Sequence, residues 1–422
     1  MIAAAGSTHA GQPLPVPNTG AEGPNRPPTG RIPRSHLALL LAVSAFYVAV
    51  ISYLCQLRFD NFYAGAFDLG VNEQLLWTGG HGYLLYETPD RLITGVHSFL
   101  EIHSTYIALG FAPVYAAAPY PSTLFVLQSV AVASSIFPLY LICRLRGVRP
   151  GLVFPFLALF LVNFALLGAL LFDFHWETFL PMEVLWYYYL VIRRSYYLAL
   201  VPLAAGTLTL ELFPFLAIGV ALLLLYERLR AIGLRPRALL RDFVVRFQLL
   251  LVFVSLVAFL VVIFAERTVI PGLVGSSGPI GVYAGINPSY RWTATSGTLW
   301  YSALYWLLLI ASLGFFPVFS PKSLLPSVPW FVESVLFQPY YSSAFGNHYA
   351  LLALATLGIA YVEGFARWTK ISEDRGVASG TSGALFGCAA VAEVVAFGGY
   401  DTFVAASNAN HSAALKIEPP TA

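Results

Sequence analysis

Long apolar runs dominate the chain, and short polar stretches separate them. The runs are continuous and do not alternate between apolar and polar residues, which argues against a membrane β-barrel. Several approach or exceed the roughly 20 residues that an α-helix needs to cross a bilayer. The pattern predicts an all-α fold, a polytopic transmembrane helical bundle. We expect about eleven spans, at residues 36–57, 122–143, 150–171, 178–192, 196–210, 212–226, 247–265, 299–318, 324–337, 348–366 and 383–400.

One further apolar run, residues 104–118, is short and ends in Pro119-Tyr120-Pro121. We expect an interfacial or re-entrant helix there. A second helix is expected at residues 69–78, closed by Gly79-Gly80. Both segments lie within residues 57–121, a stretch far longer than most connections between elements. The sequence therefore predicts a long first loop that contains juxtamembrane helices.

The same pattern divides the chain into three regions. Residues 1–35 are rich in Pro, Gly and Thr, which suits a disordered tail. Residues 36–400 form the expected transmembrane domain, and residues 401–422 form a short C-terminal tail. The first apolar run is too long for the core of a signal peptide and lacks a clear cleavage site, so we interpret it as a retained anchor.

Composition and charge support a membrane protein and orient it. The 422 residues are 58% hydrophobic and 10% charged, with a mean hydropathy of +0.72, whereas soluble domains carry about 25% charge. Lys and Arg gather in short cytoplasmic loops of membrane proteins. If residues 104–118 do not cross, 18 of the 23 basic residues fall on one side. They are Arg26, Arg31, Arg34, Arg144, Arg146, Arg149, Arg193, Arg194, Arg228, Arg230, Arg235, Arg237, Arg241, Arg246, Lys322, Arg367, Lys370 and Arg375.

This distribution predicts a multi-pass protein of the plasma membrane with a cytoplasmic N-terminus. The long loop over 57–121 then lies outside, and the outer loops hold ten of the 21 carboxylates and five of the eight histidines. Titratable groups at the ends of several helices are expected where a bundle opens to water. We therefore expect the functional site on the outer face.

Asp68 is the leading candidate for a catalytic residue. It stands just before the helix expected at 69–78, so its carboxylate could be an N-cap worth about 1 kcal/mol. Gln74 and Trp77 are three residues apart and share a face of that helix. A polar and an aromatic group beside a carboxylate suit a sugar or a phosphate, which makes Gln74 and Trp77 candidate substrate-binding residues.

Two short motifs share the pattern of an acidic residue, one other residue and a histidine. They are Glu101-Ile102-His103 and Asp173-Phe174-His175. In extended backbone, residues i and i+2 point to the same side, so each motif could aim a carboxylate and an imidazole at one point. A divalent metal ion could bind there. Alternatively, each pair orders its loop or supplies charge to a substrate. The chain has no Asp-x-Asp motif, which weakens the case for a metal.

Other residues could line the same outer site. Glu211 lies between two short apolar runs, as either a functional carboxylate or a side chain that reaches the surface at a helix break. His348-Tyr349 opens a late span and could line the cavity or belong to the interfacial belt. Arg267 and Arg291 could hold a lipid-linked phosphate or contact headgroups. Glu183 and Glu393 are weaker candidates, since each could reach an interface.

Several classes of function have no support in the sequence. The three cysteines, Cys55, Cys143 and Cys388, have no metal or disulfide spacing, so we interpret them as small membrane-embedded residues. There is no nucleic-acid-binding module, no phosphate-binding glycine loop and no zinc signature. The sequence thus indicates no nucleic-acid partner, and a divalent ion is the one cofactor that its motifs suggest.

The order of the motifs resembles a family of polytopic membrane proteins known as domain of unknown function 2079. The resemblance covers roughly residues 36–370. It rests on Phe67-Asp68-Leu69-Gly70, Gln74, Trp77, His103, Pro113-Val114-Tyr115, Pro119-Tyr120-Pro121, Gln128, Asp173-Phe174-His175, Glu177, Glu211 and His348-Tyr349.

That family is usually grouped with the GT-C superfamily of membrane glycosyltransferases. The resemblance implies a GT-C-like fold, a polyprenyl-phosphate sugar donor, juxtamembrane helices in the first outer loop, and Asp68 as the base. The chain ends soon after the last expected span, so the resemblance gives no support for an appended carbohydrate-binding domain.

We therefore expect a glycosyltransferase that moves a sugar from a polyprenyl-phosphate donor to an acceptor on the outer membrane face. Asp68 would take the acceptor proton, and Arg267, Arg291 or a divalent ion would stabilise the departing phosphate. The alternative is a transporter or flippase of a lipid-linked or small polar solute, because the short broken helices around Glu211 fit a midplane binding site. Membrane lipid and the donor are the expected partners, and the sequence names no protein partner.

Overall fold

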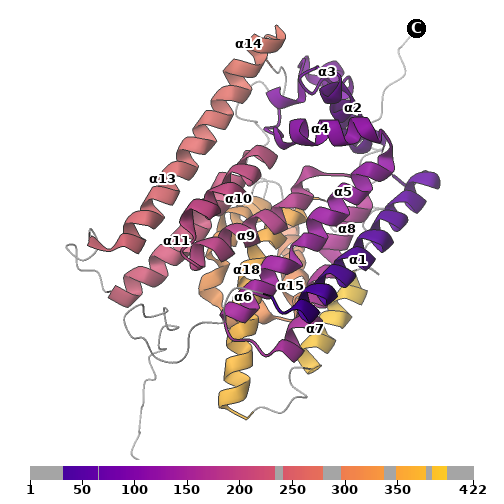
Figure 1. Cartoon of the computed structure of the whole chain (residues 1–422). Coiled ribbons are helices and arrows are strands. Elements are labelled where there is room, and N and C mark those ends of the chain that lie inside the picture. Colours follow the sequence, from indigo (N-terminus) through magenta and orange to yellow (C-terminus); the bar gives the residue numbers. More distant parts are fainter. Residues whose placement is uncertain are drawn as a thin grey trace, which may run out of the picture.

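The structure is a computed structural model, and it describes residues 32–64, 66–232, 241–278, 296–336, 348–376 and 383–396. All the regular elements in these ranges are helices. Figure 1 shows a bundle of tilted helices with a layer of shorter helices across one end. The tails at 1–31 and 397–422 lie outside the described residues.

Four helices are long and apolar enough to cross a membrane, and a bent pair brings the number to five within the described residues. The four are α1 (Arg34–Asp60), the continuous pair α5 and α6 (Pro121–Ser134 and Ile136–Leu145), α13 with its extension (Phe243–Val274), and α18 (Ala350–Asp374). The bent pair is α7 and α8 (Pro150–Leu161 and Phe164–Phe172), which meet at 42°.

The remaining expected spans are also helical, but they are shorter or less apolar. They are α9 (Leu180–Ile192), α10 (Tyr196–Thr209), α11 (Phe213–Ile232), α15 (Ser296–Ser312), α16 (Val328–Leu336), which follows the 3-10 helix η6 (Pro321–Ser327), and the helix Gly383–Ala396. The all-α architecture is confirmed. Because these helices fall below the length or hydropathy of a full crossing, about eleven spans stays a prediction.

Helix α18 is the centre of the bundle. It packs against α6, α8 and α9, and against the 3-10 helix η5 (Phe316–Phe319). Phe156 stacks on its Tyr361 and Phe365, with ring centroids 4.0 and 4.3 Å apart. Gly364 is required where α18 packs on η5, because a Cβ atom there would lie 1.8 Å from the Phe316 carbonyl oxygen. The core is therefore built on one helix near the end of the chain.

A layer that we call the cap covers one end of the bundle. It comprises α2 (Ala66–Gly80), α3 (Pro89–Thr94), the 3-10 turn η1 (Phe99–Glu101) and α4 (Ile107–Ala117). Helix α4 lies across the bundle end instead of along it (Figure 1), as expected for a helix that does not cross. Helix α2 packs on α4 through Gly80, where a Cβ would come within 2.9 Å of Ala116.

One local prediction about the cap is wrong. Asp68 was expected to be the N-cap of a helix that starts at residue 69, but α2 begins at Ala66 and Asp68 lies in its first turn. The Gly79-Gly80 pair belongs to the last turn of the same helix and gives close contact with α4. Asp68 is therefore held on helical backbone and projects from the side of α2.

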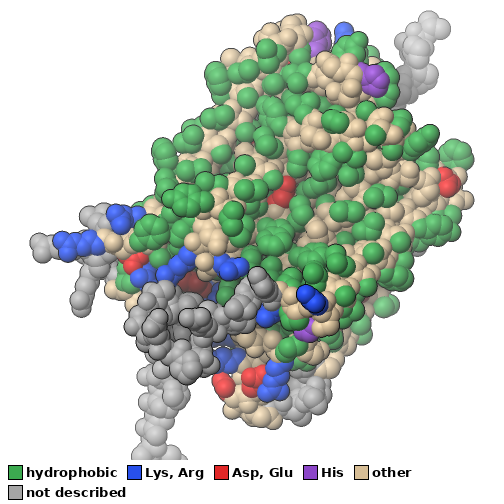
Figure 2. All heavy atoms as spheres, in the orientation of Figure 1, with side chains coloured by type: hydrophobic (Ala, Val, Ile, Leu, Met, Phe, Trp, Pro, Cys, Tyr) green, Lys and Arg blue, Asp and Glu red, His purple; other side chains and the backbone are tan. Residues whose placement is uncertain are grey.

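The basic side chains gather at the end of the molecule opposite the cap (Figure 2). Arg146 and Arg149 lie at the junction of α6 and α7, Arg193 caps α9, and Arg230 lies in the last turn of α11. This separation of basic residues from the cap agrees with the charge pattern in the sequence. Four of the basic residues counted above, Arg26, Arg31, Arg235 and Arg237, lie outside the described residues.

Candidate functional site

Asp68 faces a histidine at the boundary between the cap and the bundle. Its Oδ2 atom lies 3.6 Å from Nε2 of His175, and the Asp68 side chain keeps 37% of its surface exposed while His175 is buried. The Nδ1 atom of His175 lies 3.3 Å from the backbone carbonyl oxygen of Asp173. Since both neighbours of the ring are acceptors, the imidazolium form of His175 satisfies both contacts.

The electrostatics of His175 agree with this geometry. Burial alone would lower the pKa of the His175 imidazole, but the contact with Asp68 and the charge of Glu177 raise it above its ordinary value. Asp68 therefore has beside it an imidazole whose protonated form it favours, and an open side toward water. A carboxylate placed in this way can accept a proton from a bound hydroxyl group.

Asn72 holds the two sides of the Asp68 site together. It lies one turn after Asp68 on α2, and its Nδ2 donates to the carbonyl oxygens of Asp68 at 2.9 Å and Phe174 at 3.3 Å. Its Oδ1 accepts a hydrogen bond of 2.8 Å from the Trp176 indole. Sequence reasoning missed Asn72, although its i+4 spacing from Asp68 was a usable signal.

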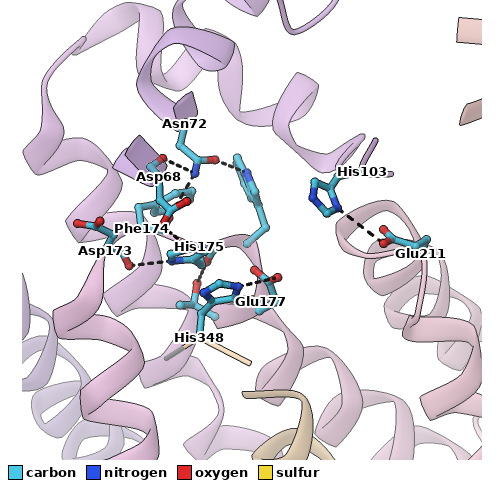
Figure 3. Close-up of polar contacts among 11 residues, drawn as sticks. Asp68, Asn72, His103, Asp173, Phe174, His175, Glu177, Glu211 and His348 are labelled. Atoms are coloured by element: carbon cyan, nitrogen blue, oxygen red, sulfur yellow. Dashed lines mark hydrogen bonds and ion pairs between the residues drawn. The ribbon is translucent and has the colours of Figure 1, made fainter. Parts of the chain in front are cut away.

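A second histidine comes to the same point from the far end of the chain. The His348 ring stacks on His175 with centroids 3.7 Å apart and planes at 12° (Figure 3). Its Nε2 atom lies 3.8 Å from Oε1 of Glu177. Burial and the neighbouring His175 imidazole lower the pKa of His348 well below its ordinary value, so His348 is neutral at pH 7. The stacked pair thus combines one ring whose pKa is raised with one whose pKa is lowered. Tyr349 contacts His348 with centroids 4.1 Å apart.

His103 and Glu211 form a second pair of side chains in the site. Their Nδ1 and Oε1 atoms are 3.8 Å apart, as Figure 3 shows to one side of the Asp68 cluster. Glu211 lies at the break between α10 and α11, and its Oε2 accepts a 3.3 Å hydrogen bond from the Ser104 backbone. The Ser104 hydroxyl donates to Glu266 at 3.0 Å. Glu211 is therefore turned toward the cap, where it contacts His103 and Ser104.

We expect a defined pH window for the His103–Glu211 pair. Burial lowers the pKa of His103, but Glu211 and Glu177 outweigh it and raise the pKa to about 9. Because the folded pKa of this histidine lies above its ordinary 6.5, its contribution to stability is complete below pH 6.5 and is lost as the pH rises through about 9. The difference in unfolding temperature between wild type and His103→Gln should shrink over that range. A difference that stays constant from pH 6.5 to 9 would contradict the pairing.

The two acidic-x-His motifs do not aim their carboxylates as the sequence suggested. Glu101 closes its own 3-10 turn, where Oε1 accepts from the backbone N–H groups of His97 at 2.7 Å and Ser98 at 2.9 Å. The Asp173 carboxylate points away from the His175 ring (Figure 3). Among the described residues, no group of three or more His, Cys, Asp or Glu side chains could hold a metal ion.

Substitutions of Glu101 can distinguish a role in helix capping from a role as a metal ligand. Glu101→Ala should lower the free energy of unfolding by about 1 kcal/mol, because it removes a capping box. Glu101→Gln keeps an acceptor oxygen and should change stability little. The measurement is thermal unfolding with and without added divalent ions. A metal-dependent stabilisation that Glu101→Gln abolishes would show that Glu101 is a ligand instead.

Other predicted site residues lie apart from the Asp68 cluster or outside the described ranges. Gln74 accepts two 3.0 Å hydrogen bonds from Thr88, and Trp77 stacks on His81 with centroids 4.0 Å apart. Arg267 lies 3.3 Å from Glu266 on the π-helical turn η3 (Ala265–Val269) that ends α13, and is partly exposed. Arg291 lies outside the described residues.

The architecture and the sequence together define the class of the protein, a multi-pass helical membrane protein. The chain belongs to the family described as predicted membrane protein (DUF2079), whose model matches residues 58–407. The matched region contains the cap, the Asp68 cluster, the His103–Glu211 pair and α18. No curated protein and no solved structure matches the chain.

Proposed function

We propose that this protein is a membrane glycosyltransferase that moves a sugar from a polyprenyl-phosphate donor to an acceptor on the outer membrane face. The observation that carries the proposal is the half-exposed Asp68 carboxylate beside a buried imidazole, in a cluster assembled from α2, the α8–α9 connection and the start of α18. Residues this far apart in sequence converge at one end of the bundle, as a reaction centre requires.

In this mechanism Asp68 is the general base. It takes the proton of the acceptor hydroxyl as that oxygen forms a bond to the anomeric carbon. The bond between the anomeric carbon and the donor phosphate breaks, and the lipid phosphate leaves with the electron pair, so the configuration at the anomeric carbon inverts. His175, fixed between Asp68 and the Asp173 carbonyl, positions the carboxylate and balances its charge.

The donor phosphate is placed at the rim of the site in this proposal. The interior carries the carboxylates of Asp68, Glu177 and Glu211, which repel a phosphate. Arg267 lies at the end of α13 with 39% of its side chain exposed, where its guanidinium could reach a headgroup. Trp77, half exposed on the outer side of α2, supports a stacking role for a sugar ring.

The orientation belongs to the proposal as well. The basic ends of α6, α7, α9 and α11 face away from the cap, which supports a cytoplasmic N-terminus and an outward cap by the positive-inside rule. About eleven spans and a GT-C-like arrangement are consistent with a cap helix, α4, that does not cross.

The transfer is tested by incubating the purified full chain in lipid with a panel of polyprenyl-phosphate sugars. We expect release of polyprenyl phosphate from at least one donor when an acceptor is supplied. If no donor in a broad panel reacts or binds, the glycosyltransferase proposal fails.

One observation favours the alternative, a transporter or flippase. The pair α7 and α8 bends by 42° at a break where Asn163 caps α8 and donates to Ser312 at 2.7 Å. Broken helices of this kind line solute sites in transporters. Uptake of a labelled lipid-linked sugar into vesicles, without its hydrolysis or transfer, would favour this alternative.

A further inference from the structure

A second carboxyl group lies inside the bundle, below the site. Glu183 is in the first turn of α9, only 2% of its surface is exposed, and the transfer mechanism does not use it. Its Oε1 atom is 2.8 Å from the hydroxyl oxygen of Thr209, the last residue of α10. Its Oε2 atom is buried and has no hydrogen-bond partner among the described residues.

The contacts of Thr209 indicate which group donates. The Thr209 hydroxyl oxygen lies 2.8 Å from Glu183 and 3.0 Å from the Ala205 carbonyl oxygen. A hydroxyl group has one proton but can also accept. Both contacts are full hydrogen bonds when Glu183 carries a proton and donates to Thr209, which then donates to Ala205. A carboxylic acid, and not a carboxylate, completes this chain.

The surroundings lead to the same protonation state. The ion pairs of the described residues include no Lys, Arg or His partner for Glu183. A buried carboxylate without a cation costs several kcal/mol, and such groups take up a proton instead. An ionisable group inside a membrane bundle is a functional candidate by default.

The helix break connects this carboxyl group to the cap. Helix α10 ends at Thr209, Leu210 has extended backbone at φ −153° and ψ 133°, and Glu211 follows. Thr209 therefore contacts Glu183 inside the bundle, while Glu211, two residues later, faces His103. Because α11 begins at Phe213, the contact of Thr209 with Glu183 and the contact of Glu211 with His103 lie on the two sides of one irregular turn between α10 and α11.

We propose that Glu183 is an internal proton-binding site, which holds its proton through Thr209 and exchanges it with the cap side through the break between α10 and α11. This goes beyond sugar transfer, in which no step needs a proton at Glu183. It supplies the stored proton that a proton-coupled movement of substrate or lipid would use.

The test is infrared difference spectroscopy on the full chain in lipid at neutral pH. Subtracting the Glu183→Gln spectrum from wild type should leave the carbonyl band of a protonated carboxylic acid. Thr209→Val should move that band to higher frequency because the acid loses its acceptor, whereas Thr209→Ser should leave it in place. The matched control is Glu373→Gln, an exposed carboxylate paired with Arg149, which should remove only carboxylate bands.

Transfer into D2O tests the exchange route. The acid band should shift within the time of the buffer change if the break gives access to water. Absence of an acid band in the Glu183→Gln difference would overturn the protonated site, and a band that never shifts in D2O would overturn the exchange. Neither readout depends on a sugar donor, so the proposed transfer activity can fail or hold independently.

Discussion

Replacement of Asp68 by Asn is expected to reduce sugar transfer by about 10²–10⁴-fold, the usual contribution of a general base. Asn keeps the size of the side chain and its place in the first turn of α2, but it cannot take a proton. The variant should still insert and fold, with an unfolding temperature only modestly below wild type, because Asp68 is partly exposed but the buried His175 loses its carboxylate partner. The measurement is the initial rate of polyprenyl-phosphate release.

The matched control for this variant is Asp60→Asn. Asp60 is exposed at the end of α1 and accepts a 2.8 Å hydrogen bond from Gln56, away from the cluster. We expect wild-type transfer from this variant. If Asp68→Asn retains wild-type activity, or if both substitutions reduce it equally, the assignment of Asp68 as the base is wrong.

The second large effect concerns stability. Glu363→Ala should lower the free energy of unfolding by about 3–5 kcal/mol, because it leaves a charged partner partly buried and unpaired. Glu363 lies on the central helix α18 and is 4% exposed. Its Oε1 atom accepts hydrogen bonds from Arg146 at 2.8 Å and from Tyr188 at 2.7 Å. The measurement is thermal or denaturant unfolding of the purified protein in detergent.

Helix α18 provides its own control for this prediction. Glu373 also pairs with an arginine, Arg149, at 2.7 Å, but both side chains are exposed. Exposed ion pairs contribute about 0–1 kcal/mol, so Glu373→Ala should change stability little. Equal losses from the two variants would show that burial does not set the strength of the Arg146–Glu363 pair.

The helical architecture and the cap could be predicted because they depend on local patterns. Continuous apolar runs predicted the helices, and the run at 104–118, which ends before Pro119, predicted α4. The number of spans was harder to predict. Runs such as 178–192 and 196–210 are apolar, but their helices contain 13 and 14 residues. Apolar composition identifies a buried helix without fixing whether it crosses completely.

The sequence predicted many of the residues that belong to the site, but it did not predict which of them are in contact. The sequence singled out Asp68, His175 and His348, and the structure brings them together. It paired Glu101 with His103, whereas His103 faces Glu211, which is 108 residues later. Asn72 and Glu177 were not among the predicted site residues. These contacts join helices distant in sequence, and spacing along one chain carries little information about them.

The most direct test of the account is a transfer assay in sealed membrane vesicles of known orientation, with a membrane-impermeant acceptor on the outside only. We predict that right-side-out vesicles containing wild-type protein and a polyprenyl-phosphate sugar glycosylate this acceptor, and that inverted vesicles and the Asp68→Asn variant do not. Product formed only in inverted vesicles, or formed equally by wild type and Asp68→Asn, would contradict an outward-facing site that works through Asp68.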